Sequence, residues 1–195
     1  MNAAAIVGII TAIIAASAAL AGYVINQLAA RREQRIKTYA EALRTIRQYQ
    51  EIPYRVARRT DSTAATRTKL DTQHGEIMSA VGFHLGWLEL ESPTTAAAYR
   101  ALWERSRIFG RVHRKWAWRQ PLVSADAEMA ITLPIRYEIK PELAICVRAM
   151  RADSHFFGWR ARRAVRRDAA ALTERRATEP PPDFTDLETW SPPTQ

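Results

Sequence analysis

The stretch from Met1 to Ala30 constrains this chain most, because it contains no Asp, Glu, Lys or Arg. From Ala3 to Ile25 nearly every residue is Ala, Ile, Val, Leu or Gly. An apolar run of about 20 residues is long enough to cross the hydrocarbon core of a bilayer as a helix. The sequence therefore predicts a transmembrane anchor over residues 1–27.

A basic segment directly after this run predicts the orientation of the anchor. Its charged residues are Arg31, Arg32, Arg35 and Lys37. Basic flanks stay on the cytoplasmic side of a membrane, so we expect a single-pass protein of the cell membrane with its N-terminus outside and its remaining domain in the cytoplasm. The competing interpretation is a signal peptide cleaved before Gly22. It is disfavoured because no basic residue precedes the apolar run.

Small residues recur at steps of three or four along the predicted anchor, at Ala4, Gly8, Ala12, Ala15, Ala19 and Gly22. Such a face allows two helices in a membrane to approach closely. Beyond the anchor, apolar residues follow the spacing of a coiled coil, at Ile36, Tyr39, Leu43 and Ile46. Two interpretations remain open: a parallel homo-oligomer, or a monomer whose seam packs on its own domain.

The sequence of residues 28–177 predicts an all-α domain that folds as a bundle of about four helices. The anchor helix should continue until Pro53 ends or kinks it near Ile52. Asp61 or Ser62 is placed to cap a second helix, and Ser92 with Pro93 should open a third. The expected segments after the first helix are helices over 63–91, 94–119 and 141–177, with a loop over 120–140.

Charge is distributed unevenly along the chain. All 29 Lys and Arg and 16 of the 20 Asp and Glu lie before Glu179, which gives that part a net charge of +13. The last four acids and five prolines lie in residues 178–195, so we expect this acidic tail to be disordered. The tail has the charge needed to fold back on a basic surface.

No pattern in the sequence indicates an enzyme. The four histidines show no metal-binding spacing; Asp71 and His74 form only a fragment of such a site. Cys146 lies in an apolar run typical of a buried residue, and as the only cysteine it excludes an internal disulfide. The few glycines form no phosphate-binding loop. We therefore expect no catalytic residue, no metal and no cofactor.

Two clusters of basic residues interleaved with aromatic residues are the strongest feature after the anchor. Anionic lipid attracts such surfaces, nucleic acid can use the same charges and rings, and a plain solvated helix face is the third interpretation. We favour lipid, because the domain is tethered near a bilayer. The candidate residues are Arg105, Arg107, Arg111, Arg114, Lys115, Arg119, Arg160, Arg162, Arg163, Arg166 and Arg167.

These patterns together predict a membrane-anchored, non-enzymatic interaction or regulatory module. Its expected partners are the lipid bilayer, anionic headgroups, and a protein partner or a second copy of the chain. Two alternatives remain. One is a membrane-tethered protein that binds nucleic acid. The other is a small membrane effector, of the toxin or phage-exclusion type, that acts by oligomerising its span.

Overall fold

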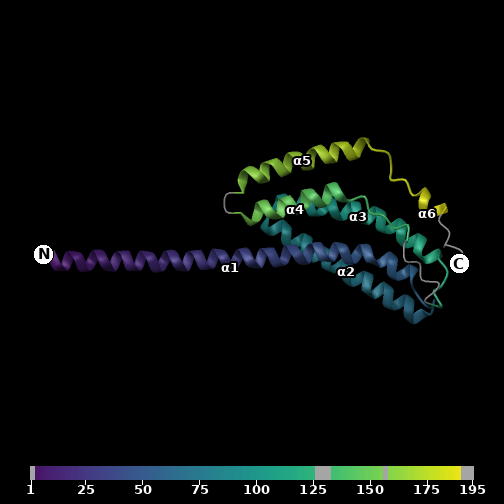
Figure 1. Ribbon diagram of the computed structural model, residues 1–195, viewed down its shortest axis with the longest axis horizontal. Helices are drawn as coiled ribbons and strands as arrows, with labels where there is room; N and C mark the ends of the chain where they lie inside the picture. The colour runs from purple at the N-terminus through teal and green to yellow at the C-terminus, as the bar shows by residue number, and fades with distance from the viewer. Residues whose placement is uncertain (1–2, 126–132, 156–157, 190–195) are drawn as a thin grey trace. The chain divides into compact units, whose positions relative to one another are not determined.

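All regular secondary structure in the described part of the chain is helical (Figure 1). The computed structural model describes residues 3–125, 133–155 and 158–189, without the side chains of residues 3–13, Asp186 and Glu188. No strand occurs in these ranges, including the described parts of the predicted loop over 120–140. The all-α prediction is confirmed there. The helices are α1 (Ala3–Ala57), α2 (Ala64–Glu91), α3 (Pro93–Arg119), α4 (Lys140–Ser154), α5 (Trp159–Thr178) and α6 (Thr185–Thr189).

The chain divides into two compact units, Met1–Tyr39 and Ala40–Gln195. In the first unit every residue from Ile14 to Ala30 is exposed. Across the residues that the structure describes, no helix has both the length and the apolar character needed to cross a membrane, so the predicted transmembrane helix lacks structural support. Three residues of the small-residue face, Ala4, Gly8 and Ala12, have side chains outside the described set.

In the second unit α3 is the central helix, in contact with α2, α4, α5 and α6. Its start is the one predicted from the sequence. The Ser92 hydroxyl accepts a hydrogen bond from the amide of Thr95, and Pro93 occupies the first turn. The face turned to the neighbouring helices carries buried residues at helical spacing, among them Tyr99, Leu102 and Phe109. The predicted helical bundle is thereby confirmed.

The end of α1 differs from the prediction at Pro53. The helix continues through this proline to Ala57. Proline lacks the N–H that would bond to the carbonyl four residues earlier, which normally disfavours a helix interior. Here the proline ring is fully buried and lies between the core residues Ile52 and Val56, so apolar burial offsets the missing hydrogen bond.

The second half of the predicted seam packs inside the protein's own bundle. Ile46 and Tyr49 are buried, and the Tyr99 hydroxyl donates to the carbonyl of Ala42 at 3.2 Å. Ile36 remains 48% exposed. From Ala42 onward the seam is therefore occupied by this chain, which leaves no continuous coiled-coil face for a second copy there.

The first turn of α2 is capped by a different residue from those expected. Thr63 is the N-cap and accepts from the amide of Thr66. Asp61 instead accepts hydrogen bonds from the amide and hydroxyl of Thr63, at 2.9 and 2.7 Å. The cap thus lies one residue beyond Ser62, the later of the two predicted positions.

The predicted helix over 141–177 is two helices, α4 and α5. The break falls at Gly158, where an added Cβ would overlap the backbone carbonyl oxygen of Ala152. Only glycine fits this close approach, so the chain turns there and α5 packs back against α4 (Figure 1). Ala152 is close to Gly158 in sequence, so this break is set by local backbone geometry.

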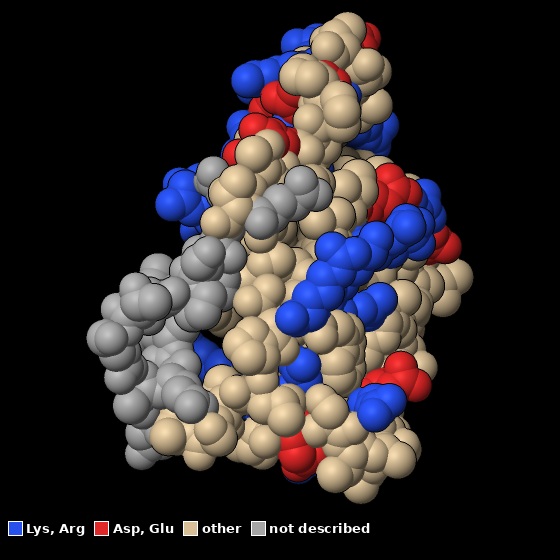
Figure 2. Space-filling model, turned by 90° about the vertical axis from the view of Figure 1, so that its right-hand side faces the viewer, with Lys and Arg blue, Asp and Glu red and all other residues tan. Residues whose placement is uncertain are grey.

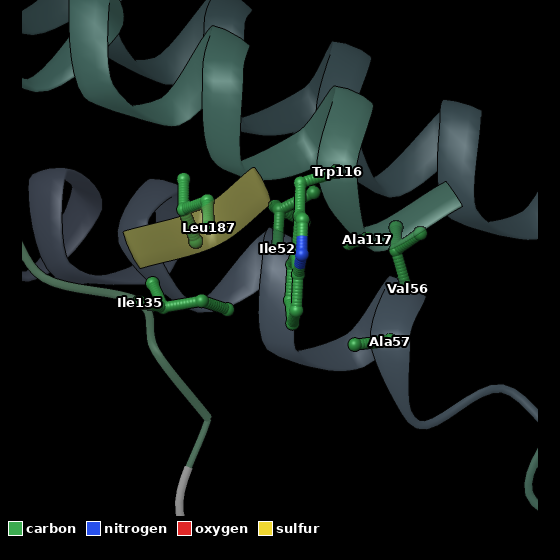
Figure 3. Packing of buried hydrophobic residues seen from close by; sticks show 7 residues of the cluster. All are labelled: Ile52, Val56, Ala57, Trp116, Ala117, Ile135 and Leu187. Carbon is green, nitrogen blue, oxygen red and sulfur yellow. The ribbon is translucent and has the colours of Figure 1, made fainter. Parts of the chain in front are cut away.

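The prediction of a disordered tail is wrong for Thr185–Thr189, which form α6. Leu187 of this helix is only 5% exposed. It belongs to a core cluster drawn from α1, α3, α6 and the segment before α4 (Figure 3). The members of the cluster are Ile52, Val56, Ala57, Trp116, Ala117, Ile135 and Leu187. Two apolar side chains, Phe184 and Leu187, therefore order an otherwise acidic and proline-rich segment.

Candidate functional site

Four basic side chains form a line along the solvent side of α3. Arg107, Arg111, Lys115 and Arg119 follow one another at intervals of four residues, which places them on one face of a helix. All four are exposed, and none forms a hydrogen bond or ion pair with another described residue. We call these residues the α3 stripe. Figure 2 shows Lys and Arg side chains lying across a largely uncharged surface on one side of the molecule.

Two other residues of the predicted first cluster are engaged elsewhere. The Arg105 side chain is 13% exposed and lies between the carboxylates of Glu138 and Glu179, at 3.9 and 4.0 Å. Its guanidinium also stacks on the ring of Phe109, 4.9 Å from the centroid. Arg114 contacts His74 of α2. The structure therefore does not bring all six candidates to one free face, since Arg105 and Arg114 contact other parts of the bundle.

The predicted second cluster, on α5, divides in the same way. Arg162 pairs with the buried carboxylate of Asp153 at 3.2 Å. Arg166 donates to the Thr94 hydroxyl at 3.0 Å, so it ties α5 to the start of α3. These two candidates hold the helices together. Of the aromatic residues beside this cluster, Phe156 and Phe157 lie outside the described residues.

The remaining basic residues of this cluster face the solvent. Arg160, Arg163 and Arg167 are exposed and lie at steps of three and four, on one side of α5. Trp159 beside them is 56% exposed, and the Arg160 guanidinium stacks on its ring at 5.0 Å. We call these four residues the α5 face. An exposed indole among arginines that form no ion pair with a described residue is the arrangement most open to a ligand on this helix.

A groove of about 680 Å³ lies between α3 and α6. Its α3 wall includes three members of the α3 stripe, Arg111, Lys115 and Arg119, together with apolar Ile108 and Val112. The opposite wall comes from Leu187 of α6 and from Phe184 directly before it. The groove thus combines apolar surface with a positively charged rim.

A charged network that the sequence reading missed lies between α4 and α5. Glu142 in the first turn of α4 is 4% exposed, and its carboxylate accepts from the Arg176 Nε at 2.8 Å. Arg176 also contacts Glu179, which lowers the pKa of that carboxyl through their hydrogen bond. Glu142 directly follows Pro141 in the first turn of α4, where the helix dipole favours an acidic residue. This position was the sign in the sequence that Glu142 has a structural role. The network fixes where the tail leaves α5.

His113 occupies a buried aromatic environment in α3. Its ring lies 4.9 Å from that of Tyr137 and perpendicular to Phe184 at 6.1 Å. His113 Nδ1 and the Tyr137 hydroxyl are buried without a hydrogen-bond partner among the described residues. Burial lowers the pKa of His113 to about 4, so the imidazole is neutral near pH 7.

This burial predicts a loss of stability in mild acid. The unfolded chain takes up a proton on His113 near pH 6.5, whereas the folded chain does so only near pH 4. The contribution of neutral His113 to the free energy of unfolding is complete above pH 6.5 and is lost as the pH falls through 4. We expect wild type to lose about 3 kcal/mol more of its free energy of unfolding across this range than His113→Leu.

Urea titrations at several pH values would measure this difference. Burial also lowers the pKa of His74 and His84, but both are present in either protein and cancel in the comparison. Parallel pH profiles for the two proteins would contradict the assignment to His113.

The residues considered for chemistry do not assemble into a reactive centre among the described residues. Cys146 is fully buried, and burial raises the pKa of its thiol to about 12, so it holds its proton at physiological pH. His74 lies beside Arg114 and Tyr49. In the described ranges no group of three His, Cys, Asp or Glu side chains could hold a metal ion.

Comparisons of the chain with models of protein families, with curated proteins and with solved structures give no match. The α5 face and the groove beside the α3 stripe are the two candidate interaction surfaces that the described residues form.

Proposed function

We propose that this protein is a non-enzymatic interaction module. In this proposal a single N-terminal helix anchors it in the cell membrane, and its basic helical domain contacts anionic lipid on the cytoplasmic side. The observation that carries the lipid contact is the α5 face. It combines three exposed arginines that form no ion pair with a described residue and a half-exposed tryptophan.

The anchor in this proposal is motivated by the exposed apolar side chains of the first unit. Its side chains include large apolar residues in open contact with solvent, such as Ile14, Leu20 and Ile25, which are each about two thirds exposed. A helix that is apolar on all sides is stable when another apolar phase surrounds it, and a bilayer provides one. The charge-free sequence from Met1 to Ala30 and the basic residues that follow agree with a span of this orientation.

The composition of the α5 face favours lipid as its ligand. An indole is well accommodated at the boundary between headgroups and acyl chains, because its ring is apolar and its N–H is polar. Arginines near an anionic surface each contribute about 1 kcal/mol of attraction. Arg163 and Arg167 lie one turn apart, so both can reach the same headgroup layer.

The same anchor helix offers a surface for a second copy. Ala15 and Ala19 are exposed, and a Cβ added at Gly22 would meet nothing within 4 Å. Helices in membranes associate through such small residues. A homo-oligomer assembled through this face belongs to the proposal.

The test has two arms. Full-length protein should stay in the membrane pellet after alkaline carbonate extraction. The fragment from Arg31 onward, which contains the whole second unit, should sediment with vesicles containing 30% phosphatidylserine. Replacing Arg163 and Arg167 with glutamine should weaken this vesicle binding about 30-fold, since about 2 kcal/mol of attraction is removed.

The matched control is Arg55→Gln together with Arg100→Gln. It changes the net charge equally, but its two arginines are exposed and already paired with Glu51 and Glu89. We expect little change in vesicle binding. Equal weakening by both pairs would show that only net charge matters and would contradict the role of the α5 face. Steeply salt-dependent binding to oligonucleotides but not to vesicles would favour nucleic acid instead.

A further inference from the structure

The tail already shows what kind of segment α3 can bind. The ring of Phe184 packs edge to face on Phe109, with centroids 5.5 Å apart at 71°. One turn later, Leu187 enters the core cluster beside Trp116 (Figure 3). The segment around these two residues is acidic and contains no Lys or Arg. An acidic segment with two apolar residues one turn apart therefore occupies part of the α3 surface.

The α6 helix leaves a charged part of this surface open. Arg111, Lys115 and Arg119 line the groove beside α6, and none of them has an ion-pair partner among the described residues. Asp183, the one acidic side chain described on the segment from Asp183 to Thr189, instead accepts from the amide and hydroxyl of Thr185. The charge complementarity that the groove offers is thus not used by the described part of the tail.

The contacts that hold α6 are few. It has five residues, and such a short helix is unstable without tertiary contacts. The connection from α5 runs through three consecutive prolines, Pro180 to Pro182, which cannot donate backbone hydrogen bonds. Among its described side chains, the stabilising contacts are the hydrogen bonds from Thr185 to Asp183 and the burial of the two apolar residues. A partner segment that competes with α6 for the α3 surface therefore has to replace few of the contacts described for α6.

We infer that the α3 surface covered by α6, together with the open groove, is a docking site for an acidic partner segment. The partner carries two apolar residues one turn apart, which replace Phe184 and Leu187. Its carboxylates pair with Arg111, Lys115 and Arg119. In the free protein α6 is the intramolecular competitor and lowers the apparent affinity for the partner. The inference deepens the proposed interaction role by naming the chemistry of a protein partner.

A labelled peptide with the sequence of residues Glu179 to Gln195 serves as the probe. Its binding to the full-length protein in neutral detergent is measured by fluorescence anisotropy. Phe184→Asp releases the intramolecular tail and should bind the peptide at least tenfold more tightly than wild type. Asp183→Ala removes only the hydrogen bonds from Thr185 and should give an increase of a few fold, which provides a second test if Phe184→Asp fails to fold.

Charge reversal tests the groove. Adding Lys115→Glu to Phe184→Asp should weaken peptide binding at least tenfold, whereas Arg163→Glu on α5 should leave it nearly unchanged. A released tail with no gain in affinity, equal losses for the two reversals, or displacement of the peptide by an oligonucleotide would each overturn the inference. So would a wild-type dimer formed by tail exchange. The assay contains no anionic lipid, so its failure is separate from failure of the vesicle test.

Discussion

Replacing Arg59 with methionine should lower the free energy of unfolding by about 4 kcal/mol and the melting temperature by about 10 °C. Arg59 is 8% exposed and forms no ion pair with a described residue. Its guanidinium instead donates to backbone carbonyls at the ends of two helices. These bonds reach Val56 at 3.0 Å, Ala117 at 3.0 Å, Trp118 at 3.2 Å and Gln120 at 2.8 Å.

The size of this effect follows from where the carbonyls lie. The last carbonyls of a helix have no partner within the helix, and they lie at the negative end of its dipole. Arg59 satisfies such groups on α1 and α3 together, and its own carbonyl accepts from the amide of Val123. Without the guanidinium, several buried acceptors lose a charged donor at once. Chemical denaturation of both proteins would measure the loss.

Two further variants separate geometry from charge. Arg59→Lys keeps the charge but has a single nitrogen, which cannot reach carbonyls of both helices, so we expect about half of the loss. Arg55→Met, one turn earlier, removes an exposed arginine paired with Glu51 and should cost less than about 1 kcal/mol. If Arg59→Met and Arg55→Met proved equally stable, the described role of Arg59 would be wrong.

Substituting alanine for Gly110 should destabilise the protein by about 3 kcal/mol. Gly110 lies on α3 against the ring of Tyr49, where an added Cβ would come within 2.8 Å of the ring Cζ. The ring has no room to retreat, because Tyr49 is 3% exposed and packs edge on against Trp103 at 4.7 Å. The two helices must therefore separate, which opens a gap in the contact between α1 and α3.

Gly75→Ala is the matched control on α2. A Cβ added there meets nothing within 4 Å, so alanine brings only its better helix propensity and should stabilise the protein by up to about 1 kcal/mol. The same chemical change thus has opposite expected signs at the two glycines. Thermal unfolding of both variants would show it. Stabilisation by Gly110→Ala would contradict the close packing of α1 on α3.

The glycines also illustrate what a sequence leaves undecided. Gly75, Gly82 and Gly86 all lie on α2, yet an added Cβ at any of them meets nothing within 4 Å. The glycine that makes a close helix contact is Gly110, and the pattern around it gave no sign of this. A glycine in a helix is ambiguous until the neighbouring helix is placed, because the contact involves residues distant in sequence.

The basic clusters likewise could be assigned only in part from the sequence. Their membership was readable from the sequence, and four-residue spacing could assign Arg107, Arg111, Lys115 and Arg119 to one side of a helix. The spacing could not show that Arg105 lies among Glu138, Glu179 and Phe109. Pairing between helices depends on how they pack, so the division into solvent-facing and structural arginines required the fold.

Local rules determined the helical class, the start of α3 at Ser92 and Pro93, and the charge-free first segment with its basic flank. Each depends on residues within a few positions of one another, which is the range over which caps, periodicity and hydropathy act. Only the tertiary structure decided that Pro53 stays inside α1 and that α6 is ordered. In both, the deciding term is burial against residues far away in the chain.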